Sequence, residues 1–201
     1  DLYEVAAGWY GDGAFHRLLS ENHRLAPRDS MEALLYGPDV VTEGKNEDST
    51  DVGSVSLPTI GLTILRNRSA EPSAVSEVLL KHGPSGGGHG HPDKLALSLY
   101  TAGEPVSPDL GSPGYRVPLH RSWYQQSFSH NTVILDRKSQ PPAEAELNSF
   151  QCQPDKPDQV RAQVHFDDKV DEIYTGTVMR RAVACSGRYF LDLFSVSAPA
   201  E

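Results

Sequence analysis

The feature that most constrains the fold is a change of hydrophobic period near residue 54. From there on, apolar and polar residues alternate, which is the period of a half-buried strand. Turn residues such as Ser186-Gly187-Arg188 separate the alternating runs, with no helical run between them. This pattern predicts an antiparallel β-sandwich or barrel. The expected strands are Leu57–Arg66, Ala74–Lys81, Leu95–Thr101, His130–Leu135, Ala145–Gln151, Val160–Phe166, Tyr174–Cys185 and Tyr189–Val196.

The first part of the chain has a helical period instead. Apolar residues from Leu2 to Trp9 fall at helical spacing. Asp29-Ser30 precedes a second apolar run and predicts a short capped helix that ends at Gly37-Pro38. Residues 39–53 are acidic and polar without a period, so we expect a linker or exposed loop there.

The acidic balance of the chain restricts its partners. The formal net charge is -9, which argues against a face that binds nucleic acid. No apolar run approaches the roughly 20 residues that a membrane helix needs, so we expect no membrane partner. The stretch from Lys81 to His130 differs, because it holds four Lys or Arg, three Asp or Glu and five of the eight histidines. This stretch is the part suited to an acidic ligand.

Within it, residues 81–94 (KHGPSGGGHGHPDK) are the most informative. The glycine run indicates a tight turn or a backbone that approaches a ligand closely. It is not a phosphate loop, because no Gly-Lys-Ser/Thr follows. His89 and His91 are two residues apart, so in an extended segment both imidazoles would project to the same side.

Asp109 and His130 follow in the strings SPDLG and SHNT. Two imidazoles and one carboxylate suit zinc, which accepts nitrogen and oxygen ligands in tetrahedral geometry. Surface histidines without a metal are the alternative interpretation.

Three motifs in this order carry a resemblance to a known family. They are GGHGHPD at residues 87–93, GEPVSPDLG at residues 103–111 and SHNTV at residues 129–133. As an ordered set they resemble the heparinase II/III-like polysaccharide lyases, which include heparin, heparan and oligoalginate lyases. The resemblance implies an (α/α) toroid followed by an antiparallel β-sandwich, in a chain that is mainly β. Residues 1–53 then hold the last toroid helices and a linker, and residues 54–201 the N-terminal part of the sandwich domain.

The resemblance also implies β-elimination on a uronic-acid glycan, beside a zinc site with a structural role. Its zinc ligands correspond to His91, Asp109 and His130, and its active-site histidine and tyrosine to His89 and Tyr115. Arginine binds sulfate and carboxylate groups through two parallel hydrogen bonds, so neighbouring basic residues are candidates for substrate binding. These residues are Arg116, His120 and Arg121.

The family's main catalytic tyrosine, with its Asn or His partner, lies in the toroid, well before the two histidines. Only 88 residues precede His89 here, and Tyr3, Tyr10 and Tyr36 fall at helical packing positions. We therefore expect an incomplete enzyme that acts on an acidic polysaccharide or oligosaccharide. The resemblance implies a bacterial protein in the periplasm or outside the cell, with the cytoplasm as the alternative, and it leaves a homodimer open.

Two other interpretations compete with the lyase. One is a cupin-like metal enzyme, but Leu95 stands four residues after His91, where a glutamate would be expected. The other is a non-catalytic carbohydrate-binding sandwich that zinc stabilises.

Overall fold

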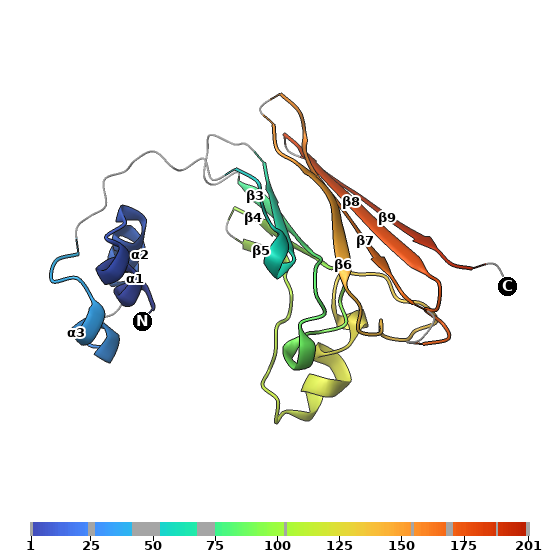
Figure 1. Ribbon diagram of the computed structural model, residues 1–201, viewed down its shortest axis with the longest axis horizontal. Coiled ribbons are helices and arrows are strands. Elements are labelled where there is room, and N and C mark those ends of the chain that lie inside the picture. Colours follow the sequence, from blue (N-terminus) through green and yellow to red (C-terminus); the bar gives the residue numbers. More distant parts are fainter. Residues whose placement is uncertain are drawn as a thin grey trace. The chain divides into compact units, whose positions relative to one another are not determined.

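The computed structural model describes residues 2–23, 27–41, 53–67, 75–102, 104–153, 155–167, 171–187 and 189–199. The chain forms two compact units, Asp1–Asp51 and Val52–Glu201 (Figure 1). The expected linker falls largely outside the described residues. Within the described parts, every helix is too short or too polar to cross a membrane.

The smaller unit contains the helices α1 (Leu2–Tyr10), α2 (Gly13–His23) and α3 (Met31–Tyr36). The last of these confirms the predicted capped helix. The Ser30 hydroxyl accepts a hydrogen bond from the Ala33 amide at 3.1 Å, which satisfies a backbone donor of the first turn. Gly37 follows as the C-cap, and its amide donates to the carbonyl of Ala33.

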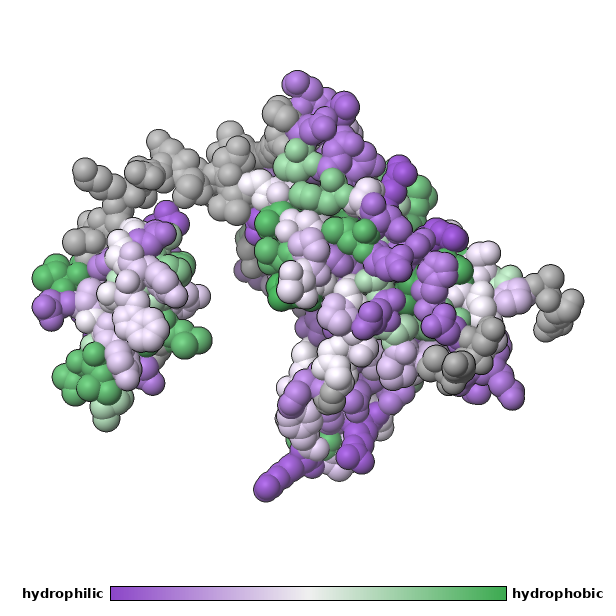
Figure 2. All heavy atoms as spheres, viewed as in Figure 1, coloured by the Kyte–Doolittle hydropathy of each residue, from purple (hydrophilic) through white to green (hydrophobic). Residues whose placement is uncertain are grey.

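A partly buried ion pair joins the segments of this unit. The side chain of Glu4 is fully buried and accepts hydrogen bonds from Arg28 Nε at 2.9 Å and Nη2 at 2.8 Å. His23 Nε2 lies 3.0 Å from the same carboxylate. Many apolar side chains of the unit nevertheless remain exposed, including Leu2 and Leu34, and hydrophobic spheres are visible on its surface (Figure 2).

The larger unit consists of two antiparallel sheets that lie face to face (Figure 1). The first sheet has the order β1-β2-β3-β4-β5 and the second the order β6-β7-β8-β9. The predicted mainly β, antiparallel sandwich is therefore confirmed. The strands are β1 (Val55–Leu57), β2 (Leu62–Arg66), β3 (Ser76–Lys81), β4 (Leu97–Thr101), β5 (Glu104–Ser107), β6 (Ala145–Gln151), β7 (Asp158–His165), β8 (Val178–Ser186) and β9 (Tyr189–Ser197).

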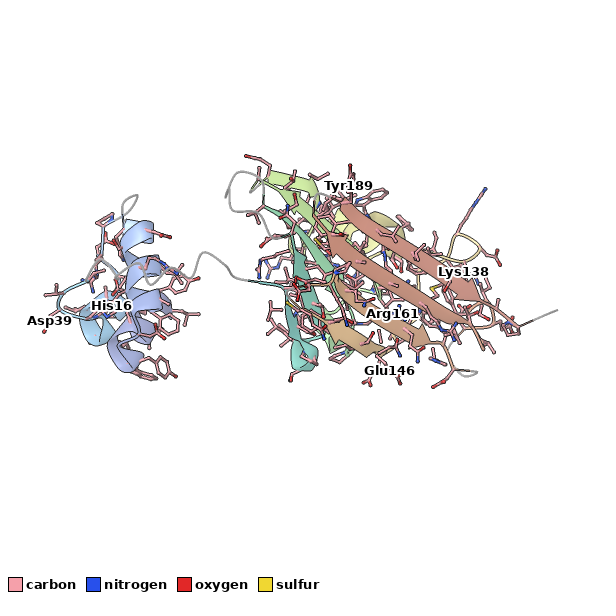
Figure 3. All side chains as sticks on the ribbon, turned by 90° about the horizontal axis from the view of Figure 1, so that it is seen from above. His16, Asp39, Lys138, Glu146, Arg161 and Tyr189 are labelled. Atoms are coloured by element: carbon pink, nitrogen blue, oxygen red, sulfur yellow. The ribbon has the colours of Figure 1, made fainter. Side chains whose placement is uncertain are left out.

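The core lies between the two sheets. Leu65 and Leu80 come from the first sheet, and Val160, Val164 and Met179 come from the second. Burial along β7 alternates, so one face is in the core and the other is exposed, as the period of two predicted. Exposed side chains of the second sheet include Arg161 and Tyr189 (Figure 3).

The predicted strand His130–Leu135 is wrong. Apart from the Asn131 carbonyl, which accepts from the Leu97 amide, its backbone hydrogen bonds go to side chains and nearby loop residues and not to a neighbouring strand. Gln140 Nε2 donates to the carbonyl of Val133 at 3.0 Å, and the Leu135 amide donates to the hydroxyl of Tyr174 at 3.0 Å. Because these contacts satisfy the backbone, the segment remains a loop.

Two further segments differ from the expected strands. Leu57–Arg66 is divided by a 3-10 turn at Pro58–Ile60 and by Gly61, whose φ is 73°. A Cβ at Gly61 would lie 2.2 Å from the His82 carbonyl oxygen, so only glycine fits this hairpin. Glu104–Ser107, which lies outside the expected strands, forms β5 at the sheet edge, where Pro105 removes no interior hydrogen bond.

Candidate functional site

Two loops bring the candidate residues together at one end of the sandwich. The first covers residues 82–96, between β3 and β4, and the second covers residues 108–144, between β5 and β6. Both loops gather at the same end of the two sheets, where they are coloured green to yellow (Figure 1). Strands of the first sheet thus hold residues from distant parts of the sequence next to one another.

The glycine run makes a compact turn. Gly87–His89 is a 3-10 turn, and Gly86 and Gly87 have φ values of 79° and 59°. A Cβ at Gly90 would lie 1.9 Å from the Ser85 carbonyl oxygen. The segment is therefore not extended, contrary to the expectation that His89 and His91 project to the same side, and the two rings contact different partners.

His91 forms a cluster with His130. Nδ1 of His91 lies 3.2 Å from Nε2 of His130. Nδ1 of His130 lies 3.1 Å from Oδ2 of Asp109, and Nε2 of His130 donates to the Tyr124 carbonyl at 3.1 Å. The structure thus brings together His91, Asp109 and His130, the three residues that we expected to hold zinc.

Asp93 is a second carboxylate of this cluster. Ligand atoms of His91, Asp93 and His130 all lie within 4.8 Å of one another. Asp93 is fully buried, its Oδ2 accepts from Lys81 Nζ at 2.5 Å, and its Oδ1 has no hydrogen-bond partner within the described part of the chain. A buried carboxylate oxygen without a partner is costly unless a cation or water satisfies it. The nitrogen and oxygen donors therefore fit a metal ion such as zinc.

The electrostatic environment separates the two histidines. Burial, and the nearby charge of His130, lower the pKa of His91, which favours the neutral form that ligates metals. Burial by itself would lower the pKa of His130, but the hydrogen bond to Asp109 and the charges of Asp93 and Asp109 outweigh it and raise that pKa. The same hydrogen bond holds the pKa of Asp109 far below its ordinary value.

His89 lies on the exposed side of the loops. Its Nδ1 makes a short hydrogen bond with the hydroxyl of Tyr115, and the two ring centroids are 5.6 Å apart. Tyr115 itself is 62% exposed. The two residues expected to be catalytic therefore form a pair that a bound ligand can reach.

His120 connects this pair to the metal cluster. Its ring centroid lies 5.0 Å from that of Tyr115 and 6.0 Å from that of His91. The His91 and His130 rings continue the row at 5.2 Å. His120 begins a π-helical segment, His120–Tyr124, which also supplies the Tyr124 carbonyl to His130.

The three expected substrate-binding residues therefore lie in different environments. His120 is buried, whereas Arg116 and Arg121 are exposed. The two arginines lie at exposed positions that an anionic group can reach. Neither Asp93 nor Lys81 was assigned a role from the sequence, although Asp93 is the last residue of the GGHGHPD motif.

A cavity of about 320 Å³ opens beside His91. Its lining includes the buried Lys94, whose Nζ donates to the Pro84 carbonyl at 2.5 Å and whose pKa is lowered by burial. Gln140 also lines it, but both ends of its amide are engaged by the backbone, through the Lys94 amide and the Val133 carbonyl. These hydrogen bonds fix the cavity wall next to the 82–96 loop, which carries His89 and His91.

Comparison with known proteins identifies the family. The family described as "Heparinase II/III-like, C-terminal" matches residues 50–198. The chain therefore belongs to the heparinase II/III-like family. This result supports the lyase interpretation over the cupin-like alternative.

Individual relatives agree with this assignment. An alginate lyase from Stenotrophomonas maltophilia is 35% identical over 89 residues, 39% of this chain and 12% of the relative. A heparin-sulfate lyase from Pedobacter heparinus is 27% identical over 114 residues, 55% of this chain and 17% of the relative. The crystal structure of a heparan sulfate lyase from Pedobacter heparinus shares the fold, with a TM-score of 0.64 at 20% identity, over 94% of this chain and 28% of that one. The matched region is thus less than a third of these relatives.

Proposed function

We propose that this chain is the β-sandwich part of a polysaccharide lyase that cleaves uronic-acid-containing glycans by β-elimination. The observation that carries the proposal is the exposed His89–Tyr115 pair, linked through His120 to a cluster that suits a metal. Family membership and relatives that act as alginate and heparin-sulfate lyases support it.

β-elimination sets three chemical tasks. The uronate carboxylate must be neutralised, a base must remove the C5 proton, and an acid must protonate the leaving oxygen. His89 can donate a hydrogen bond to the carboxylate or accept the proton, since its Nε2 faces away from the Nδ1 that Tyr115 occupies. The Tyr115 hydroxyl can donate a proton to the leaving oxygen or hold the sugar.

For the metal, we propose zinc with the ligands His91, Asp109 and His130, and with Asp93 as an additional carboxylate in the same cluster. When bound, zinc would supply a fixed positive charge that ties the 82–96 loop to the 108–144 loop. The proposed role is structural, because the cluster holds the loop that carries His89 whereas the His89–Tyr115 pair lies on the exposed side.

An acidic polysaccharide or oligosaccharide is the proposed partner. The exposed Arg116 and Arg121 are suited to its sulfate or carboxylate groups, and they lie in the same loop as Tyr115. We propose a location in the periplasm or outside a bacterial cell, as the family resemblance implies, with the cytoplasm as the alternative.

We further propose that the smaller unit is the end of a helical toroid. The exposure of Leu2, Trp9 and Leu34 supports this, because a toroid would bury such side chains against neighbouring helices. We also propose that the remaining catalytic groups of the enzyme come from the toroid.

The test follows the absorbance of the unsaturated product with heparan sulfate and with alginate. The 201-residue chain is compared with a longer protein that includes a complete helical region. We expect turnover from the longer protein and little from the chain alone. If both bind the glycan but neither releases unsaturated product, the chain is a zinc-stabilised carbohydrate-binding sandwich instead.

A further inference from the structure

An arginine occupies a core-facing position in the second sheet. Arg181 lies on β8 between Met179 and Val183, whose side chains face the core, and it is only 5% exposed. Charged side chains are rarely buried to this extent unless each donor has a partner. The partners of Arg181 therefore indicate what it does.

Part of the guanidinium is held by the neighbouring strand. Nε donates to Oδ1 of Asp192 at 2.9 Å, and Nη2 donates to Oδ2 at 2.6 Å, which is the paired geometry of a strong arginine–carboxylate contact. The guanidinium also lies 5.3 Å from the ring centroid of Phe194. These β9 residues fix the direction in which the remaining N–H groups point.

Those remaining donors reach the two loops of the candidate site. Nη1 donates to the Leu95 carbonyl at 2.7 Å and to the Asn131 carbonyl at 2.6 Å. Nη2 also lies 3.1 Å from Oδ1 of Asn131. One side chain of the second sheet thus contacts both the 82–96 loop and the 108–144 loop.

The contacted residues are adjacent to the metal cluster. Leu95 follows Asp93 by two residues and has an unfavourable φ of 62°, so its conformation needs support from its surroundings. Asn131 directly follows His130, and its carbonyl also accepts from the Leu97 amide at 3.1 Å. The segment after His130 is a loop, so Arg181 supplies part of the support that a strand partner would otherwise give.

We propose that Arg181 is a positioning residue that sets the distance between His91 and His130 by holding the two loops in register. The proposal rests on the proposed metal site, and it adds a contribution from the second sheet to a site otherwise built on loops of the first. Lysine cannot replace arginine here, because a single ammonium cannot join Asp192 and two separate carbonyls in this planar arrangement.

The experiment uses the 201-residue chain and Co²⁺, whose visible absorption reports the geometry of its ligands. Arg181→Lys and Arg181→Met are compared with Arg180→Met, which changes the adjacent exposed arginine on the same strand. Val183→Ala is a second control, because it weakens core packing on the same face of β8 and removes no hydrogen bond. Melting temperatures are measured for every variant.

We expect both Arg181 variants to alter the Co²⁺ spectrum and to weaken binding by about tenfold or more, as loss of residues behind metal ligands commonly does. Arg180→Met and Val183→Ala should keep the original spectrum, even though Val183→Ala lowers the melting temperature. If Arg181→Met does not fold, Arg181→Lys decides. A folded Arg181→Lys protein with unchanged spectrum and affinity would overturn the proposal.

Hydrogen exchange separates this proposal from the proposed metal site. If the unaltered chain takes up no Co²⁺, the metal site is wrong, and the Leu97 amide then reports on Arg181. Its exchange should be faster in Arg181→Lys than in Arg180→Met and Val183→Ala. Equal exchange in all three would show that Arg181 does not hold the loops.

Discussion

Oδ2 of Asp93 lies 3.8 Å from Nδ1 of His130, and both side chains are buried. The same nitrogen of His130 also approaches Asp109, at 3.1 Å. Two carboxylates therefore converge on one imidazole nitrogen, although they belong to different loops. A cation beside His130 would relieve the repulsion between the two carboxylates. Replacing each carboxylate and measuring the metal affinity is therefore the most direct test of the cluster.

Replacing either carboxylate should weaken zinc binding. We expect Asp93→Asn and Asp109→Asn each to raise the Kd for zinc by about tenfold or more, because each removes a negative charge near the metal. Calorimetric titration measures the change. Asp136→Asn is the matched control, since Asp136 is an exposed residue of the 108–144 loop. A normal Kd for Asp93→Asn would remove Asp93 from the site.

His91→Ala should abolish stoichiometric zinc. The imidazole lies 3.2 Å from His130, and burial lowers its pKa, which favours the neutral form that ligates a metal. Metal content after dialysis is measured by elemental analysis. His165→Ala changes an exposed histidine at the end of β7 and should leave the zinc content at one per chain. Zinc retained in His91→Ala would contradict the proposed ligands.

Removing zinc should affect stability more than glycan affinity. The proposed ligands come from separate segments, and at saturating zinc the metal would raise the melting temperature by about 5 °C or more relative to the chelated protein. Calorimetric scans with and without chelator measure this effect, and binding of an oligosaccharide is measured in parallel. An unchanged melting temperature would argue against a structural metal.

Within a longer, active protein, His89 and Tyr115 should both be needed for turnover. His89→Ala is expected to lower kcat by about 100-fold or more, as loss of a general acid or base commonly does. Tyr115→Phe keeps the ring but removes the hydroxyl that contacts His89, so it should also lower kcat. Tyr189→Phe, at an exposed position on β9, is the control. Full activity of His89→Ala would exclude it from the chemistry.

The smaller unit should lose stability at acidic pH. The hydrogen bond from Arg28 lowers the pKa of Glu4 below its ordinary value of 4.5. A carboxylate with a lowered pKa stabilises the fold above the unfolded-state value, and this contribution is lost as the pH falls through the folded-state value. Glu4→Gln should therefore weaken the unit at neutral pH, by about 2 kcal/mol, and flatten this acid dependence.

Hydrogen exchange of the α1 and α2 amides provides the measurement for Glu4→Gln. Glu21→Gln, at an exposed position of α2, is the matched variant and should retain the acid dependence of the unaltered chain. Equal protection of the helices in Glu4→Gln and the unaltered chain at neutral pH would show that the ion pair between Glu4 and Arg28 contributes little.

Local patterns predicted much of the fold. The period of two identified seven of the eight expected strand regions, because burial on one face requires alternation along each strand. The exceptions arise from contacts outside the segment. His130–Leu135 is apolar enough for a strand, but Gln140 and Tyr174 take its backbone groups. Residues 104–107 form β5 because they pair with β4 at the edge of the first sheet. A proline, which has no amide hydrogen to donate, is tolerated in such an edge strand.

The sequence by itself determined the residue types of the candidate site and their order, since the histidines, Asp109 and the glycine run are visible as a motif. Which atoms meet was decided only by the tertiary structure. His89 contacts Tyr115 and His91 contacts His130, because the glycines form a tight turn where an extended segment was expected. The roles of Asp93 and Arg181 depend on burial by residues outside their own segments. Asp93 is buried beside Lys81, and Arg181 is buried between Asp192 and the two loops.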